Sequence, residues 1–317
     1  MKPTIPKWMK VLSIGLLAAC IAGFVFSATA APKKVLVVTV TKGFRHSSIP
    51  TAEKILAELG EKSGAFTVDF ARVEPKDPQF KGDDAKPDTN KVSAAIGQVL
   101  AEKMSPAALK NYDGVIFANT TGDLPLPDKQ AFLNWIKSGK AFIGMHSATD
   151  TFDHHKPVDP YVEMLGAEFR AHNKQCEIDC INQDPKHPAC SHLGPTFHVK
   201  DEIYLMTNFD RSKVHGLLGL DKHPPDGSAE GKEQTPGDYP IAWYKLYGNG
   251  RVFYTSLGHR EDVWDPNTPA GFNRENSKEV AEAYQQHILG GIKWALGLEK
   301  AEPEQNVRTR KAVANDQ

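Results

Sequence analysis

Apolar residues along the first half of the chain follow two different periods. Short runs that are apolar at almost every position have the length of buried strands, and segments between them carry apolar residues at helical spacing. The strand-like runs are Val35–Val40, Gly114–Asn119 and Ala141–Met145, together with the alternating run Phe66–Phe70, and the clearest helix is Asp128–Ser138. Strands that alternate with helices predict an α/β fold with a doubly wound, mostly parallel sheet.

The second half of the chain has a different pattern. Over residues 177–253, short strand-like segments such as Glu202–Met206 and Ile241–Tyr244 are separated by turns rich in proline and glycine. This pattern predicts a β-rich insertion in the α/β domain. The run Val252–Leu257 predicts a last core strand, and a helix predicted over Ser277–Ala295 closes the domain.

The N-terminal segment predicts export. Three lysines within the first ten residues precede an apolar run from Val11 to Phe26, and the small residues Ala28-Thr29-Ala30 follow it. A basic segment, an apolar segment and an A-x-A site are the parts of a cleaved signal peptide. We therefore predict a signal peptide at residues 1–30, a periplasmic or secreted protein, and no membrane anchor after cleavage.

Two alternatives to cleavage after Ala30 are an uncleaved anchor and a lipoprotein attached through Cys20. The apolar run is shorter than the roughly 20 residues that a spanning helix needs. Lipid on Cys20 would leave the apolar segment Ile21–Phe26 where a polar tether is usual. Cleavage leaves one domain over residues 31–299, followed by a charged segment over residues 300–317 that predicts a disordered tail.

Charge excludes some classes of partner. The net charge is −1, with 38 basic and 39 acidic residues. This balance provides no basic surface for nucleic acid or an anionic membrane. We expect no nucleic-acid partner, and likewise no nucleotide cofactor.

Three cysteines remain after removal of the signal: Cys176, Cys180 and Cys190. In an oxidising compartment they predict one local disulfide and one leftover thiol. A metal knot is the alternative, because His187 and His192 flank Cys190 and these residue types bind zinc. The spacing matches no standard zinc finger, which favours the disulfide.

Three histidines fall where strands of the predicted sheet end. His46 follows the first strand, His146 follows the strand ending at Met145, and His259 follows the strand ending at Leu257. Ligands of open parallel sheets bind beyond the carboxyl ends of the strands. One histidine in a loop is ordinary, whereas three at such positions predict a single histidine site.

The sequence around His146 predicts a tight turn between a strand and a helix. Gly144–Ala148 has the pattern of a nucleophile elbow, which presents one side chain at the top of a sheet. That side chain is an imidazole here rather than a hydroxyl or a thiol. Ser147 is interpreted as a helix-start residue, because nothing in the sequence identifies a base directed at it.

Several separated segments, in a constant order, carry a resemblance to a known family. They are Thr41–His46, Gly144–Asp150, Asp201–Tyr204, Pro240–Trp243 and Gly250–His259. Together they resemble the ThuA family of trehalose-utilisation proteins, over most of the chain from residue 35 to residue 298. The resemblance implies a flavodoxin-like fold similar to that of class I glutamine amidotransferases.

The chemistry of the amidotransferases is not retained. In those enzymes a cysteine occupies the elbow, and a late His-x-Glu sequence supplies the base. The chain keeps His259-Arg260-Glu261 but has His146 where the thiol would stand. Glutamine hydrolysis through a cysteine thioester is therefore excluded, and the fold alone does not assign a function.

The ThuA resemblance implies a role in handling carbohydrates. ThuA-like proteins are associated with disaccharides, including sugars oxidised at the third carbon, so we expect a small carbohydrate ligand and an upstream sugar dehydrogenase as a partner. The predicted activity is histidine acid/base chemistry on a glycoside or 3-keto-glycoside, with His46, His146, His259 and Asp150 as catalytic residues. A divalent metal, zinc or similar, held by the three histidines would polarise a substrate oxygen. The alternative is a non-catalytic sugar-binding protein on the same scaffold.

Four further residues are candidates for substrate binding. Glu202 and Tyr204 alternate on one predicted strand and would face the same side. His172 matches a family histidine after a Gly-Ala-x-Phe segment, and the ring of Trp243 could stack on a sugar. Ordinary structural roles are the alternatives: a cap or ion pair for Asp150, and core packing for Tyr204 and Trp243.

Overall fold

The computed structural model describes residues 1, 31–84, 86–172, 174–224, 235–268 and 271–301. One compact unit begins at Pro32. The predicted signal peptide and C-terminal tail lie outside the described residues except at Met1 and at residues 300–301, so both stay predictions. Across the described ranges, no helix is both long and apolar enough to cross a membrane.

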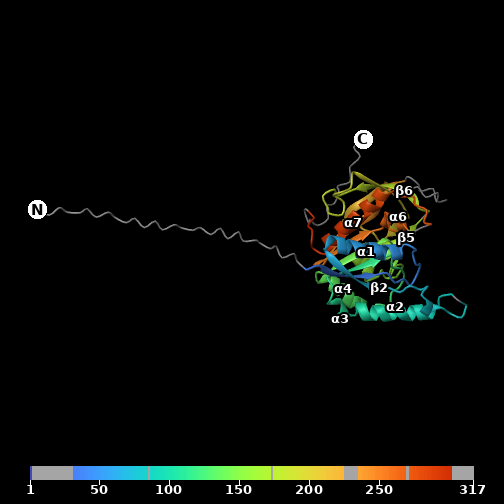
Figure 1. The fold of residues 1–317 in the computed structure, drawn as a ribbon. Helices are drawn as coiled ribbons and strands as arrows, with labels where there is room; N and C mark the ends of the chain where they lie inside the picture. The colour runs from blue at the N-terminus through green and yellow to red at the C-terminus, as the bar shows by residue number, and fades with distance from the viewer. Residues whose placement is uncertain (2–30, 85, 173, 225–234, 269–270, 302–317) are drawn as a thin grey trace. The chain divides into compact units, whose positions relative to one another are not determined.

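A nine-stranded sheet forms the frame of the domain (Figure 1). Its strands are β1 (Lys33–Val38), β2 (Phe66–Ala71), β3 (Gly114–Ala118), β4 (Ala141–Met145), β6 (Cys176–Asn182), β7 (Thr196–Asp201), β9 (His215–Lys222), β10 (Pro236–Tyr247) and β11 (Gly250–Thr255). They are ordered β2-β1-β3-β4-β11-β10-β9-β6-β7, with parallel pairing from β2 to β11 and antiparallel pairing beyond it. A second, two-stranded sheet pairs β5 (Glu168–His172) with β8 (Tyr204–Thr207).

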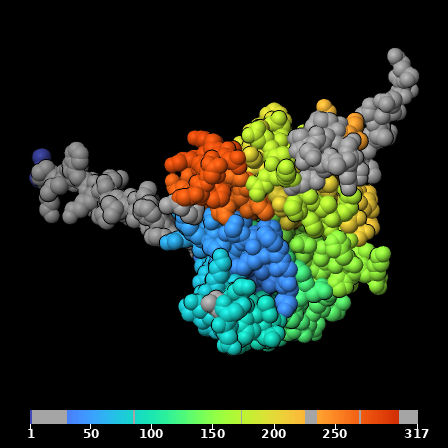
Figure 2. Space-filling view, turned by 90° about the vertical axis from the view of Figure 1, so that its right-hand side faces the viewer, coloured from blue at the N-terminus to red at the C-terminus, as the bar shows by residue number. Residues whose placement is uncertain are grey.

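Helices cover both faces of the large sheet. They are α1 (Ile49–Ser63), α2 (Thr89–Met104), α3 (Pro106–Leu109), α4 (Lys129–Lys137), α5 (Pro160–Leu165), α6 (Glu261–Trp264) and α7 (Lys278–Ala295), with 3-10 turns η1 (Pro78–Phe80), η2 (His146–Asp150) and η3 (Arg211–Lys213). The helices α1 (blue) and α7 (orange) lie side by side, as Figure 1 and Figure 2 show. In Figure 1, α2, α3 and α4 lie on the opposite side of the sheet from α1 and α7.

Alternation along the buried strands produces two hydrophobic cores. In β1, Val35 and Val37 belong to the core that contains Ile55 of α1 and Ile288 of α7. The intervening residues Leu36 and Val38 belong to the other core, which includes apolar side chains of α2, α4 and α5. Because successive side chains of a strand point to opposite faces, a strand buried on both faces is apolar at every position. The predicted doubly wound α/β fold is confirmed.

The predicted β-rich insertion extends the large sheet through β6, β7, β9 and β10. One predicted strand is displaced: β8 begins at Tyr204, and Glu202 lies in the turn between β7 and β8. The backbone N–H of Glu202 donates to the side chain of Asp201 at 2.9 Å, which replaces a strand partner. Glu202 and Tyr204 therefore do not alternate along one strand.

The predicted disulfide is wrong. No disulfide joins Cys176, Cys180 and Cys190. Cys176 and Cys180 are four residues apart on the extended strand β6, which separates their Cα atoms by about 13 Å. The Cys190 thiol is buried and donates to the carbonyl oxygen of Leu217 at 3.8 Å. The alternative metal knot finds no support either, because the potential metal-ligand group found among the described residues is a different one.

Candidate metal and catalytic site

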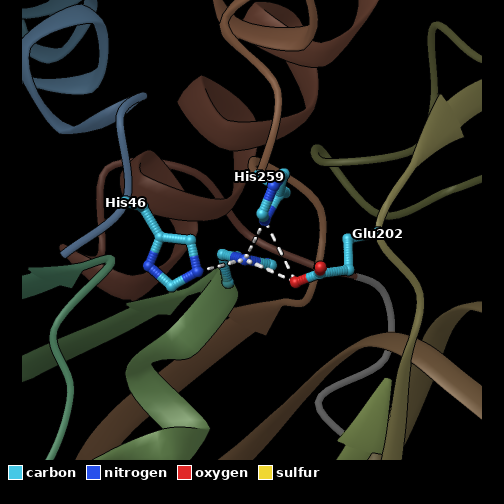
Figure 3. A group of neighbouring side chains, drawn as sticks. His46, Glu202 and His259 are labelled. Atoms are coloured by element: carbon cyan, nitrogen blue, oxygen red, sulfur yellow. Dashed lines mark hydrogen bonds and ion pairs between the residues drawn. The ribbon is translucent and has the colours of Figure 1, made fainter. Parts of the chain in front are cut away.

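Loops at the carboxyl edge of the sheet bring four candidate residues together (Figure 3). His46 follows β1, His146 directly follows β4, and His259 follows β11. Glu202, in the turn after β7, completes the group. One nitrogen or oxygen atom of each residue lies within 4.8 Å of those of the others. The structure therefore assembles the three predicted histidines and adds a carboxylate.

His146 occupies the predicted elbow. Its φ is 48°, a left-handed conformation that non-glycine residues rarely adopt, and η2 begins at this residue. Its Nδ1 lies 2.8 Å from the carbonyl oxygen of Ser256, and the carbonyl oxygen of His146 accepts a hydrogen bond from the Tyr254 hydroxyl at 2.7 Å. Since a carbonyl oxygen only accepts, Nδ1 carries the proton, and Nε2 of the neutral ring presents a lone pair to the other three residues.

The distances around this lone pair fit a metal ion. From His146 Nε2, the distances are 3.2 Å to His46 Nε2, 3.3 Å to His259 Nδ1 and 3.7 Å to Glu202 Oε2. His259 Nδ1 and Glu202 Oε2 are 3.0 Å apart. Ligand atoms of a tetrahedral zinc site lie about 3.3 Å from one another, because each is about 2.0 Å from the metal. The group could hold a divalent cation such as zinc, with three nitrogen ligands and one oxygen ligand.

Burial and neighbouring imidazoles determine the protonation states. Desolvation, followed by the nearby His259 and His172, lowers the pKa of His46 to about 3. Desolvation, followed by charge repulsion from His46 and His259, holds the pKa of His146 well below its usual range. For His259, desolvation lowers the pKa, but hydrogen bonding to Glu202 and its charge outweigh this effect and raise it. His46 and His146 are therefore neutral near pH 7, as metal ligands must be.

The group opens toward solvent on one side. The side chain of His146 is fully buried, whereas that of His259 is 20% exposed and that of His172 is 45% exposed. His172 Nδ1 lies 3.0 Å from Glu202 Oε1, so the carboxylate connects the buried group to the open side. The ring of Tyr204, 4.4 Å from that of His146 between centroids, forms part of the wall. Both His172 and Tyr204, predicted as substrate-binding residues, thus lie at the site.

The chain matches one known protein family over most of its length. Residues 34–295 match the family ThuA, described as trehalose utilisation. The chain belongs to the ThuA family. No curated protein matches the sequence. Membership of the ThuA family indicates a carbohydrate-related role.

Two solved structures share the ThuA fold. A ThuA-like protein from Bacteroides uniformis has 18% identity and a TM-score of 0.58, with 86% of this chain and 95% of that one covered. A ThuA-like protein from Parabacteroides merdae has 18% identity and a TM-score of 0.56, with 84% and 90% covered. At this identity the similarity supports the fold alone.

Asp150 and Trp243, also predicted as site residues of this ThuA protein, belong neither to the group of four nor to the residues described above beside it. Asp150 is hydrogen-bonded to Asp153, and burial, this hydrogen bond and the charge of Asp153 raise the pKa of Asp150 to about 7. Trp243 is fully buried, its indole N–H donates to the carbonyl oxygen of Leu165 at 2.9 Å, and its ring packs on Tyr254. Trp243 is a core residue, because its one polar atom is satisfied inside the protein.

Some residues that support the site carry no clear signal in the sequence. Ser147 is the second residue of η2, at the start of this turn as interpreted, but its hydroxyl forms no capping hydrogen bond and lies 3.3 Å from His46 Nδ1. The Ser48 hydroxyl, just before α1, donates to the carbonyl oxygen of Gly258 and accepts from Asn119. The Asp201 carboxylate accepts from the backbone N–H groups of Gly258 and Arg260. Only Asp201, next to Glu202 in a family segment, could have been found from the sequence.

Proposed function

We propose that this ThuA protein is an exported enzyme that acts on a glycoside or 3-keto-glycoside through histidine chemistry assisted by a divalent metal. The observation that carries the proposal is the convergence of His46, His259 and Glu202 on the unprotonated Nε2 of the buried His146. Several electron-rich atoms that face one another in a buried place favour a cation between them. Sugar binding alone would more simply use Asp, Asn and Trp side chains.

The lowered pKa values divide the roles among the histidines. A general base works best when its pKa is near the working pH, so His46, with a pKa of about 3, is a poor base. The same reasoning applies to His146. Both fit the role of metal ligand, which replaces our expectation of acid/base catalysis by these two rings. A divalent cation in the group would polarise a carbonyl oxygen of the sugar.

His172 is the best-placed proton acceptor. It lies on the open side of the site, and Glu202 Oε1 is 3.0 Å from its Nδ1. A carboxylate in this position orients an imidazole and stabilises the imidazolium that forms. In a 3-keto-glycoside the hydrogen on C2 is acidic because it lies beside the carbonyl. Its removal begins either isomerisation or elimination, and in elimination the C1–O bond breaks and the leaving oxygen takes a proton.

The test is turnover of trehalose that has been oxidised at the third carbon. Wild type is compared with His146→Ala and with His198→Ala, whose histidine is exposed and pairs with Asp179. We expect His146→Ala to lower kcat at least about 100-fold, since it removes a ligand of the cation that would polarise the sugar carbonyl. The control His198→Ala should keep wild-type turnover. Melting temperatures and sugar binding of each variant are measured in parallel.

The outcomes separate an enzyme from a binding module. Lost turnover with sugar binding retained in His146→Ala supports the enzyme. Sugar binding by wild type without conversion of the keto-sugar or the parent glycoside contradicts it and favours the non-catalytic protein. Export rests on the signal pattern of residues 1–30. It is tested by finding an N terminus at Ala31 in the periplasmic or culture-medium fraction.

A further inference from the structure

An aromatic side chain is displayed at the edge of the candidate site. Phe44 is 66% exposed, and apart from Met1 the exposed large apolar side chains of the described residues are Phe44, Leu246 and Leu298. Single exposed apolar residues are common on proteins and need no explanation by themselves. Phe44 differs because its ring lies edge-on against His46, with 4.9 Å between ring centroids. It is thus the exposed neighbour of a buried member of the site.

The backbone around Phe44 is held by Thr121. The Lys42 N–H donates to the carbonyl oxygen of Thr121 at 2.8 Å, and the Gly43 N–H donates to its hydroxyl at 3.2 Å. The same hydroxyl donates to the carbonyl oxygen of Phe44 at 2.9 Å. A Cβ atom on Gly43 would lie 3.1 Å from this hydroxyl, so glycine permits the close approach. The exposed ring therefore projects from an anchored loop.

The two residues that follow Phe44 make contacts within the protein. Arg45 forms an ion pair with Glu74 at 3.0 Å and donates to the carbonyl oxygen of Thr39. His46 is buried in the group of four. The loop thus presents an apolar ring to solvent beside a buried polar centre. A ligand that contacts both the Phe44 ring and the polar group needs an apolar face and a polar edge, and a pyranose ring has both.

We infer that Phe44 is a stacking platform for the second sugar ring of a disaccharide whose first ring is at the histidine group. The inference rests on the proposed function and adds to it a residue that determines specificity for glycosides whose leaving group is itself a sugar. Aromatic rings provide rigid, weakly polar surface on which the C–H face of a pyranose can pack. A monosaccharide at the histidine group leaves this platform uncovered. Phe44 therefore determines preference for disaccharides over monosaccharides.

The experiment measures binding of trehalose and glucose to the full-length protein by calorimetry. We expect Phe44→Ala to weaken trehalose binding about tenfold and glucose binding less than about twofold, since only the disaccharide reaches the platform. Phe44→Trp should restore the affinity for trehalose. Leu246→Ala is the matched control, because Leu246 is also exposed. Leu246 pairs with Arg251 near the start of β11, whereas His259 follows the end of that strand. It should bind both sugars as wild type does.

Each contrary result is distinct. Wild-type affinity of Phe44→Ala for trehalose would overturn the inference and leave the proposed function standing. An equal loss of affinity for glucose and trehalose would place the stacked ring at the histidine group and overturn the assignment to the second ring. A wild-type protein that binds neither sugar would overturn the inference, whereas the proposed function would still be decided by turnover of the keto-sugar.

Discussion

The carboxylate of Asp201 accepts a hydrogen bond from the backbone N–H of Gly258 at 2.7 Å. Its other oxygen accepts from the N–H groups of Glu202 at 2.9 Å and of Arg260 at 3.2 Å. Glu202 is a member of the candidate metal group, and Gly258 and Arg260 are the chain neighbours of another member, His259. One fully buried side chain therefore joins the turn after β7 to the loop after β11. Hydrogen bonds of this kind fix the positions of residues that can bind a metal, although the residue that accepts them does not bind the metal itself.

Asp201→Asn should weaken metal binding. The amide replaces one acceptor oxygen by an NH₂ group that faces backbone N–H donors, so hydrogen bonds are lost and the two segments separate. We expect an affinity for zinc about tenfold lower and a free energy of unfolding about 1–3 kcal/mol lower. Competition with a fluorescent zinc chelator measures the first, and denaturant unfolding of the metal-free protein measures the second.

A matched control separates positioning from general destabilisation. Asp69 of β2 accepts hydrogen bonds from Tyr112 and Lys103 and is outside the candidate site. Asp69→Asn should lower stability without changing the affinity for zinc. If Asp201→Asn binds zinc as tightly as wild type, Asp201 has only a structural role.

Glu202→Gln should release most of the bound metal. The substitution keeps the shape of the side chain but removes the charge from the oxygen 3.0 Å from His259 Nδ1. We expect the zinc affinity to fall about 100-fold, since a neutral amide is a weak zinc ligand. Elemental analysis after dialysis against a dilute chelator gives the stoichiometry. The control His198→Ala should retain one equivalent, and unchanged metal content in Glu202→Gln would argue against Glu202 as a ligand.

Asp150→Asn should change how stability depends on pH. The pKa of Asp150 is raised from 3.8 to about 7 by burial, by its hydrogen bond to Asp153 and by the charge of Asp153. The folded protein therefore holds a proton that the unfolded chain releases, and its stability falls as pH rises from about 4 to about 7. Asparagine removes this dependence. We expect the variant to be about 1–2 kcal/mol more stable than wild type near pH 8 and equal to it near pH 5.

Denaturant unfolding at the two pH values tests this difference. Asp83 lies in an exposed turn, and Asp83→Asn is the control. It should change the free energy of unfolding by the same small amount at both pH values. A stability difference between Asp150→Asn and wild type that is the same near pH 5 and near pH 8 would contradict the raised pKa.

The two buried thiols should be protected in the native protein. Cys180 and Cys190 are fully buried, and burial raises the pKa of both. In a Cys20→Ser/Cys176→Ser protein we expect reaction with a thiol reagent to be at least about 100-fold slower than in denaturant, because a buried thiol is neither exposed nor ionised. Two thiols should titrate after unfolding without reductant. No reactive thiol in denaturant would show that Cys180 and Cys190 form a disulfide after all.

The histidine site shows why part of this molecule was predictable. His46, His146 and His259 each follow a strand whose apolar run is visible in the sequence, and parallel strands place their carboxyl ends at one edge. Glu202 was predicted as a residue at the site but on the wrong element, because the side chain of Asp201 engages its backbone N–H in place of a strand partner. That competition between a side chain and a strand leaves no periodic signal.

The two aromatic residues Trp243 and Phe44 show the opposite case. Trp243, predicted to bind substrate, is enclosed between Tyr254 and Phe209 once β10 and β11 pair. Phe44, an ordinary apolar residue in the sequence, is exposed because Thr121, from the loop after β3, holds its backbone. Burial of a side chain depends on segments far away in the chain, and residue type alone does not report it.

The sequence by itself determined the class of fold, the family and the three histidines, because strand periodicity and strand ends are local properties of the chain. The tertiary structure decided the fourth member of the group, the separation of the cysteines and the protonation states of the imidazoles. Each of these depends on distances between loops that meet only after the sheet has formed. The lone pair of His146 is the clearest example, since its direction depends on the carbonyl oxygen of Ser256, 110 residues away in the chain.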